Sequence, residues 1–193
     1  TDDALAAAVA TSPTATAMLD GMAAGGAVGL ALWPEDLRHP VAWESCMPPI
    51  TAPEQLQGRT VRAIPSGVTL ELLTALGATQ IFVDGYGSMV ESCEIQAAES
   101  GLRQGSTLEG TPTFTGDVTF FPKFQVLAAG AAAFDQLTPA QQTALREAAV
   151  AVRDQALAEH PSEADAAAAW CADGGRVVLA GPDAVAAFQA AAQ

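Results

Sequence analysis

Apolar segments of the strand type alternate with helical patterns along this chain, and that alternation most constrains its fold. Strands are expected at residues 28–33, 60–64, 79–83, 93–97, 111–121, 124–128 and 177–180. Helices are expected at residues 2–10, 13–24, from 51, at 69–76, 88–92, 139–159, 161–173 and 182–191. Alternating strands and helices, with one helix much longer than the rest, predict an α/β fold with parallel strand pairing.

Local signals predict where several helices begin. Thr138 is expected to cap a helix, and Pro139 is expected to be its first helical residue. Thr51 is expected to cap a helix with Glu54 as its capping-box partner. Asp3 is the expected cap of the first helix.

Three segments are expected to be irregular. Residues 34–49 contain several prolines and follow a strand pattern, so we expect a loop there. Pro122 is expected to break an extended run, because proline cannot donate a ladder hydrogen bond. Residues 98–101 are expected to form a loop after a short strand.

Charge excludes several classes of partner. The chain of 193 residues carries 8 basic and 22 acidic side chains, for a net charge of −14. Nucleic acids and anionic membranes favour clusters of Lys and Arg, so neither is an expected partner. The sequence contains no apolar run of the roughly 18 residues that a membrane span requires. Its opening, Thr1-Asp2-Asp3, is not a signal peptide and would suit either a mature N-terminus or an internal cut.

The cysteines leave two interpretations open. Cys46, Cys93 and Cys171 are widely spaced, and the only histidines are His39 and His160. One disulfide and one free thiol would suit an oxidising compartment, whereas three small buried side chains would suit any compartment. No metal site, no cofactor and no enzymatic constellation are expected from these residues.

Arg62 is the principal candidate for a binding residue. It ends the strand pattern that begins at Thr60 and precedes a turn at Pro65 and Ser66. Open α/β folds place ligand-anchoring groups at such strand ends. A guanidinium there can hold a carboxylate through two parallel hydrogen bonds. The alternative is a surface charge paired with a nearby acid.

The chain resembles the periplasmic solute-binding proteins of TRAP transporters over roughly residues 10 to 190. Residues 53–62, PEQLQGRTVR, are similar to a family stretch of the form PEDLKGLKIR that ends in arginine. Further segments match in order: GLALW at 29–33, LRH at 37–39, ALGA at 75–78, IQAAESG at 95–101, TGDVTFF at 115–121 and AFDQLTPAQQ at 133–142. The segment at 95–101 is degenerate, with Gln96, Ala97 and Ser100 where the family has Asp, Gly and Asn.

The resemblance implies a periplasmic-binding-protein-like lobe, with a mostly parallel mixed sheet flanked by helices and one long C-terminal helix. Residues 1–193 would be the C-terminal portion of a two-lobed clamp whose first lobe is largely absent. The ligand-binding lobe would cover about 28–130, and a helical hinge with the C-terminal segment about 131–193.

The resemblance also implies the role of each candidate site residue. Arg62 would grip the carboxylate of a small organic acid, with Arg38 as a flanking cation. Tyr86 would form an aromatic wall, and Glu99 would orient a side chain or accept a ligand hydroxyl. Gln96 and Phe121 would complete the site. Phe82 could line the same cleft, although core packing is the commoner role for both phenylalanines.

The implied function is extracytoplasmic binding of a small carboxylate for delivery to membrane permease subunits, without enzymatic activity. The protein would be periplasmic, either free or held at the membrane as a lipoprotein. The alternative function is a stand-alone extracytoplasmic sensor or protein-interaction domain that has lost transport. A bare inter-lobe face would favour a dimer.

Overall fold

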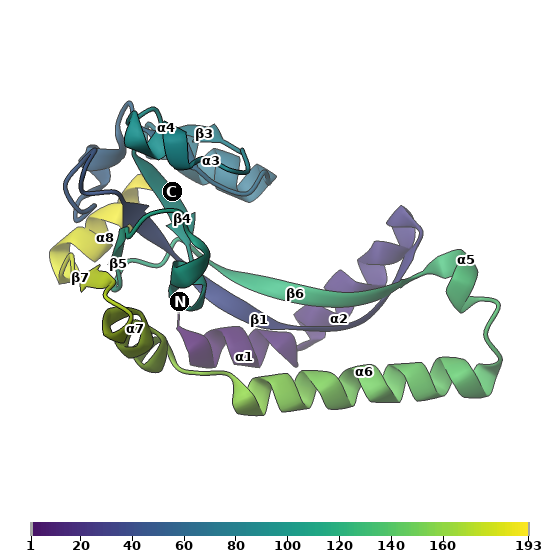
Figure 1. The fold of residues 1–193 in the computed structure, drawn as a ribbon. Helices are drawn as coiled ribbons and strands as arrows, with labels where there is room; N and C mark the ends of the chain where they lie inside the picture. Colours follow the sequence, from purple (N-terminus) through teal and green to yellow (C-terminus); the bar gives the residue numbers. More distant parts are fainter. Residues whose placement is uncertain (1, 193) are drawn as a thin grey trace. The chain divides into compact units, whose positions relative to one another are not determined.

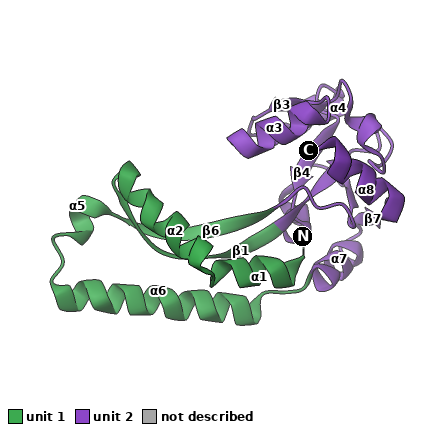
Figure 2. Cartoon of the chain, turned by 180° about the vertical axis from the view of Figure 1, so that it is seen from behind, with its two compact units in different colours: residues 1–36, 122–162 green, residues 37–121, 163–193 purple. Residues whose placement is uncertain are grey.

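The computed structural model describes residues 2–192, which form two compact units (Figure 2). The first unit contains the described residues up to Asp36 together with residues 122–162. The second unit contains Leu37–Phe121 and the described residues from Glu163 onward. Each unit has its own apolar core, so each is described by itself.

The first unit is helical with two long strands. Its elements are α1 (Asp3–Ala10), α2 (Pro13–Gly21), the 3-10 helix η1 (Met22–Gly25), the first part of β1 (Ala27–Ala42), β6 (Phe121–Gly130), α5 (Ala131–Phe134) and α6 (Pro139–Glu159) (Figure 1). Strand β6 pairs with β1. Leu30 and Ala31 of β1 pack with Phe134 and with Ala149 of α6, which forms one cluster of this core.

The helix starts of this unit depend on side-chain caps. The Thr138 N–H donates to Gln141 Oε1 at 2.9 Å, and the Gln141 N–H donates to Thr138 Oγ1 at 3.4 Å. This reciprocal capping box confirms the predicted start of α6 at Pro139. At α1 the cap is Asp2, which accepts the Leu5 N–H at 2.7 Å. The prediction of Asp3 as the cap was wrong by one residue.

The second unit is an α/β sandwich. Its remaining elements are η2 (Pro53–Leu56), β2 (Thr60–Arg62), α3 (Gly67–Ala75), β3 (Thr79–Ile81), α4 (Gly87–Glu91), β4 (Ala97–Ser100), η3 (Leu102–Thr107), β5 (Thr113–Thr115), α7 (Glu163–Ala172), β7 (Arg176–Val178) and α8 (Pro182–Ala191). The strand order is β3-β2-β4-β1-β5-β7. The β2–β3, β2–β4 and β5–β7 pairs are parallel, whereas β1 is antiparallel to β4 and β5. The predicted α/β class with a mixed sheet flanked by helices is therefore confirmed.

Successive strand residues point to opposite faces of this sheet and feed two cores. Ala42 and Ala97 belong to a cluster that includes Leu73 of α3 and Phe188 of α8. Their neighbours Val41 and Ala98 belong to a second cluster, which includes Val90 of α4 and Trp170 of α7. The sheet is therefore covered by α3 and α8 on one face and by α4 and α7 on the other.

Three segments that were expected to be irregular are strands in whole or in part, although residues 43–49 are irregular as expected. Strand β1 continues through Pro34 and Pro40 to Ala42, and Pro122 lies inside β6. The φ of proline, about −65°, falls within the β region, so each proline removes one donor without ending the strand. Residues 97–100, expected mainly as a loop, form β4, whose four residues are all buried. Their position between β2 and β1 overrides their weak β-propensity.

A fourth correction concerns the helix expected to start at Thr51. The element is a short 3-10 helix, and Gln55 satisfies its free donors in place of Glu54. Gln55 Oε1 accepts the N–H groups of Thr51 at 2.7 Å and Ala52 at 2.8 Å.

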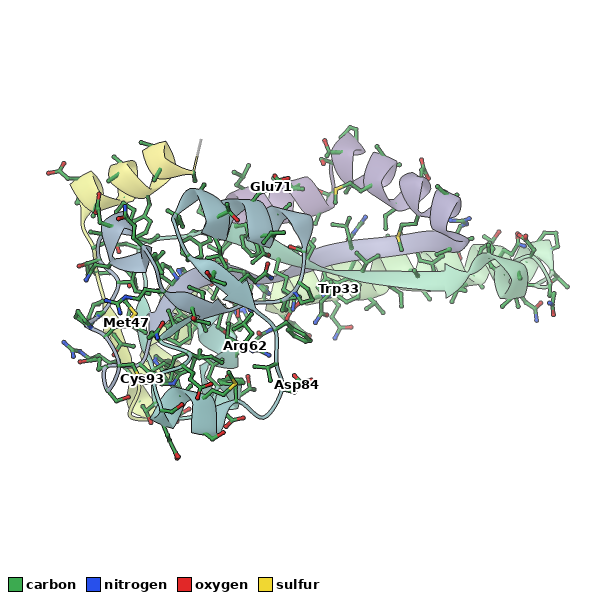
Figure 3. The ribbon with its side chains drawn as sticks, turned by 90° about the horizontal axis from the view of Figure 1, so that it is seen from above. Trp33, Met47, Arg62, Glu71, Asp84 and Cys93 are labelled. Carbon is green, nitrogen blue, oxygen red and sulfur yellow. A yellow bond between two sulfur atoms is a disulfide. The ribbon has the colours of Figure 1, made fainter. Side chains whose placement is uncertain are left out.

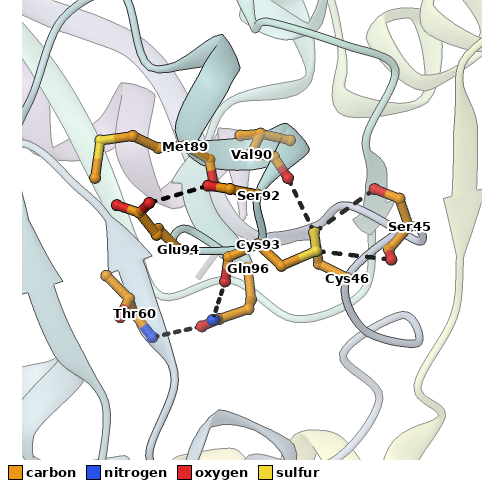
Figure 4. Close-up of a disulfide and its surroundings, with 9 residues drawn as sticks. All are labelled: Ser45, Cys46, Thr60, Met89, Val90, Ser92, Cys93, Glu94 and Gln96. Atoms are coloured by element: carbon orange, nitrogen blue, oxygen red, sulfur yellow. Dashed lines mark hydrogen bonds between the residues drawn. A yellow bond between two sulfur atoms is a disulfide. The ribbon is translucent and has the colours of Figure 1, made fainter.

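Two of the three cysteines, all of which lie in the second unit, form a disulfide. Cys46 and Cys93 are 47 positions apart in the sequence, and their Cα atoms are 5.3 Å apart (Figure 4). Cys171 is a free, exposed thiol. Of the two interpretations that the sequence left open, one disulfide with one free thiol is the correct one. Cys93 is also the one non-glycine residue with positive φ, 57°, in the part of the chain that the structure describes.

Candidate functional site: a cavity at the strand ends

The candidate site lies where the strands of the second unit end. Strands β2, β3 and β4 are parallel, so their carboxyl ends meet at one edge of the sheet. Arg62 ends β2 opposite Ala98 of β4, and Ser100 ends β4 opposite His39 of β1. This edge therefore collects Arg62, Glu99 and Ser100, with Arg38 beside them on β1. Open α/β sheets bind ligands in such a crevice.

A cavity of about 400 Å³ opens at this edge and is lined only by residues of the second unit. That volume lies within the roughly 300–1,000 Å³ of small-molecule sites. The charged and aromatic side chains of the lining are Arg38, Arg62, Phe82, Asp84, Tyr86 and Glu109.

Arg62 is held in the cavity by aromatic rings. Its Cζ lies 5.0 Å from the ring centre of Tyr86 and 5.6 Å from that of Phe82. Both distances are within the roughly 6 Å range of cation–π attraction. Its Nη2 lies 3.9 Å from Oδ1 of Asp84 (Figure 3), and its Nε donates a long hydrogen bond of 3.5 Å to the Val83 carbonyl. Among residues 2–192, the guanidinium is thus positioned without a short bond to a carboxylate.

Arg38 has the opposite environment, because each of its three guanidinium nitrogens donates a hydrogen bond. It is 2% exposed, and its Nε donates to Glu99 Oε2 at 2.5 Å. Its Nη1 donates to Gln104 Oε1 at 2.9 Å, and its Nη2 donates to the Glu99 carbonyl at 3.1 Å. A buried charge is tolerated only when such bonds replace its hydration.

Glu99 links this pair to the loop that carries Arg62. The side chain is 1% exposed, and its second oxygen, Oε1, accepts the Ile64 N–H at 3.2 Å. Ile64 lies two residues after Arg62 and lines the cavity. The carboxylate therefore fixes both Arg38 and the backbone after β2.

Contacts with Glu109 and Trp43 fix the position of Tyr86, the aromatic wall of the cavity. The Tyr86 hydroxyl accepts the Glu109 N–H at 3.3 Å, and the Trp43 Nε1–H donates to the Glu109 carbonyl at 2.8 Å. The rings of Trp43 and Tyr86 meet edge to face, with centres 5.9 Å apart. The absence of a side chain at Gly87 leaves room for the Glu109 carboxylate, because a Cβ there would lie 2.2 Å from its Oε2.

The structure brings together four of the six candidate residues and separates two. Arg62, Arg38 and Tyr86 line the cavity, and Glu99 lies directly behind it. Gln96 is not in the lining, since its Oε1 accepts the Thr60 N–H at 2.8 Å and its Nε2 donates to the Cys93 carbonyl (Figure 4). Phe121 begins β6 and is also outside the lining.

Several lining residues were missed by the sequence reasoning, among them Asp84, Gln104 and Glu109. The Asp-Gly turn directly after a parallel strand was a usable signal for Asp84. No local pattern marks the other two, which lie in the segment after β4. Phe82, expected in the core, is 50% exposed beside Arg62, so that expectation was wrong.

Neither a metal centre nor a membrane span is evident in the described chain. Across residues 2–192, no three His, Cys, Asp or Glu side chains are grouped so that they could hold a metal ion. None of the helices within that range combines the length and the apolarity needed to cross a membrane.

Comparison with known proteins identifies the fold. No family model matches the chain, and no curated protein sequence gives a significant match. Among solved structures, a TRAP periplasmic solute-binding protein from Xanthobacter autotrophicus with bound β-D-galacturonate is 25% identical, with a TM-score of 0.79. It is matched over 100% of this chain and 64% of its own.

Two further neighbours show the same fold at lower identity. The Pseudomonas aeruginosa protein with bound L-malate is 19% identical, with a TM-score of 0.73 and coverage of 94% of this chain and 64% of its own. The Shewanella oneidensis protein with bound succinate is 16% identical, with a TM-score of 0.75 and coverage of 94% and 60%. The chain thus spans less than two thirds of the length of these neighbours.

These matches define the class of protein. The chain has an α/β fold of the periplasmic-binding-protein type, and its structural neighbours are solute-binding proteins. More particularly, they are TRAP periplasmic solute-binding proteins, so the resemblance seen in the sequence is confirmed. The neighbours are periplasmic, in agreement with the expected extracytoplasmic location.

Proposed function

We propose that this protein binds a small organic acid outside the cytoplasm, with Arg62 as the anchor of the carboxylate. The observation that carries the proposal is the contrast between the two arginines of the cavity. Each guanidinium nitrogen of Arg38 donates a hydrogen bond, whereas Arg62 lies beside two aromatic rings and is 3.9 Å from the Asp84 carboxylate. A planar fork presented in this way suits a bidentate bond to a carboxylate.

The roles of the remaining residues follow from their contacts. Tyr86 and Phe82 lie within cation–π range of the Arg62 guanidinium and attract it to its place in the cavity. Glu99 positions Arg38 and the backbone after β2, and therefore acts on the ligand through other groups. The cavity wall offers a guanidinium and aromatic rings as binding groups, which supports a binding protein. The neighbours are likewise solute-binding proteins, with bound galacturonate, malate and succinate.

We further propose that the bound acid is delivered to the permease subunits of a TRAP-type transporter. Support comes from the class of the structural neighbours. Deleting the encoding gene should then abolish high-affinity uptake of the acid that binds. Unchanged uptake would argue against delivery while leaving the binding site in place.

Calorimetry with galacturonate, malate and succinate tests the binding site. A charge-assisted bond contributes about 1.5–3 kcal/mol, so Arg62→Ala should weaken binding at least tenfold. Arg62→Lys should also bind more weakly, because an ammonium cannot form the fork. Arg176→Ala removes an arginine that is 60% exposed and outside the cavity lining, so it should leave affinity unchanged. Equal affinity in wild type and Arg62→Ala would contradict the proposal.

A further inference from the structure

The charges at the cavity sum to a negative value once Glu99, which lies behind the wall, is counted. The cavity lining contains the arginines Arg38 and Arg62 and the acids Asp84 and Glu109. The positive charge of Arg38 is already neutralised by Glu99, at 2.5 Å, behind the cavity wall. With Glu99 included, two arginines stand against three carboxylates, which gives a formal charge of −1, and Arg62 is left to face Asp84 and Glu109.

Neither acid of the lining is committed to a partner as Glu99 is. The Asp84 side chain is 89% exposed, and it forms an ion pair with Arg62 at 3.9 Å. The Glu109 carboxylate lies against Gly87, while the hydrogen bonds of this residue are made by its backbone N–H and carbonyl. Within residues 2–192, neither carboxylate accepts a hydrogen bond, so both remain able to accept one from a ligand.

We infer that the cavity selects acids with a single carboxylate and hydroxyl groups elsewhere, and that Asp84 and Glu109 determine this specificity. The inference rests on the proposed function, because Arg62 must hold the first carboxylate. A second carboxylate would find no uncommitted cation in this wall and would be repelled by two like charges. A hydroxyl at the same place can donate to either acid in a charge-assisted hydrogen bond.

Matched pairs of ligands that differ only by oxidation of a terminal CH₂OH to a carboxylate test this inference by calorimetry. D-gluconate is paired with D-glucarate, glycerate with tartronate, 3,4-dihydroxybutyrate with malate, and 4-hydroxybutyrate with succinate. In each pair that binds, the monocarboxylate should bind at least tenfold more tightly. The double variant Asp84→Asn/Glu109→Gln should narrow that ratio by strengthening the dicarboxylate, because it removes both like charges and keeps the size of the side chains.

Asp154→Asn is the control, because it removes an exposed acid of α6 in the other unit and should leave every ratio unchanged. Equal or tighter binding of the dicarboxylates would overturn the inference and leave the proposed function in place. A ratio unchanged in the double variant would equally overturn the role of Asp84 and Glu109. If none of the eight acids nor galacturonate binds, the proposed function fails and the inference fails with it.

Discussion

Removing the carboxylate of Glu99 should destabilise the second unit strongly. In Glu99→Ala, the guanidinium of Arg38 stays 2% exposed without its charge partner, and the Ile64 N–H loses the acceptor at 3.2 Å. Breaking a buried ion pair costs about 3–5 kcal/mol. A chain of this size loses about 2–4 °C of melting temperature per kcal/mol, so Tm should fall by about 6–20 °C.

Urea unfolding monitored by circular dichroism measures this cost. Asp154→Ala is the control, because it breaks a solvent-exposed ion pair. The Asp154 side chain is 58% exposed and that of its partner Arg153 is 22% exposed, so the loss should cost about 0–1 kcal/mol. The double variant Arg38→Met/Glu99→Leu should recover most of the lost stability, because apolar groups of similar volume need no charge partner. A cost for Glu99→Ala no larger than that for Asp154→Ala would refute the assignment of a buried, positioning ion pair.

Three other predictions concern stability. Replacing Cys46 and Cys93 by serine opens a loop of 47 positions, which should cost up to about 4 kcal/mol; an unchanged urea midpoint would contradict the disulfide. The pKa of Glu44 is held below its ordinary value, chiefly by the hydrogen bond from the Thr113 hydroxyl. The stabilisation by the Glu44 carboxylate should be fully present at pH values above its ordinary pKa. It should disappear as the pH falls through the lowered pKa. The free energies of unfolding of wild type and Glu44→Gln should therefore differ at neutral pH and converge in acid. A difference between them that grows in acid would contradict the lowered pKa of Glu44. Thr138→Ala should cost about 1 kcal/mol, because α6 loses its capping box; no change in Tm would mean that the cap is unimportant.

The elements with strong local signals were predictable from the sequence. Helix α6 begins and ends where Thr138, Pro139 and the apolar period place it, and α8 spans the predicted residues 182–191. The errors lie where tertiary position decides. Pro34 and Pro40 stay in β1, and the weak strand former Ala97 begins β4 because strands lie on both sides of it.

The candidate site was predictable in part for the same reason. Arg62 was found because a strand end and a turn mark its place locally. The commitment of Arg38 to Glu99 was not visible, since the two residues are 61 positions apart and meet only when β1 pairs with β4. No local sequence pattern marks Glu109 either. Its place in the wall follows from hydrogen bonds of its backbone with the side chains of Tyr86 and Trp43.

A crystal structure of the chain with galacturonate bound would test the role of Arg62 most directly. We expect both carboxylate oxygens to lie about 2.7–2.9 Å from guanidinium nitrogens of Arg62. Arg38 should keep its three bonds to Glu99 and Gln104. A carboxylate bound elsewhere in the cavity, with Arg62 still facing Asp84, would contradict the proposed anchor.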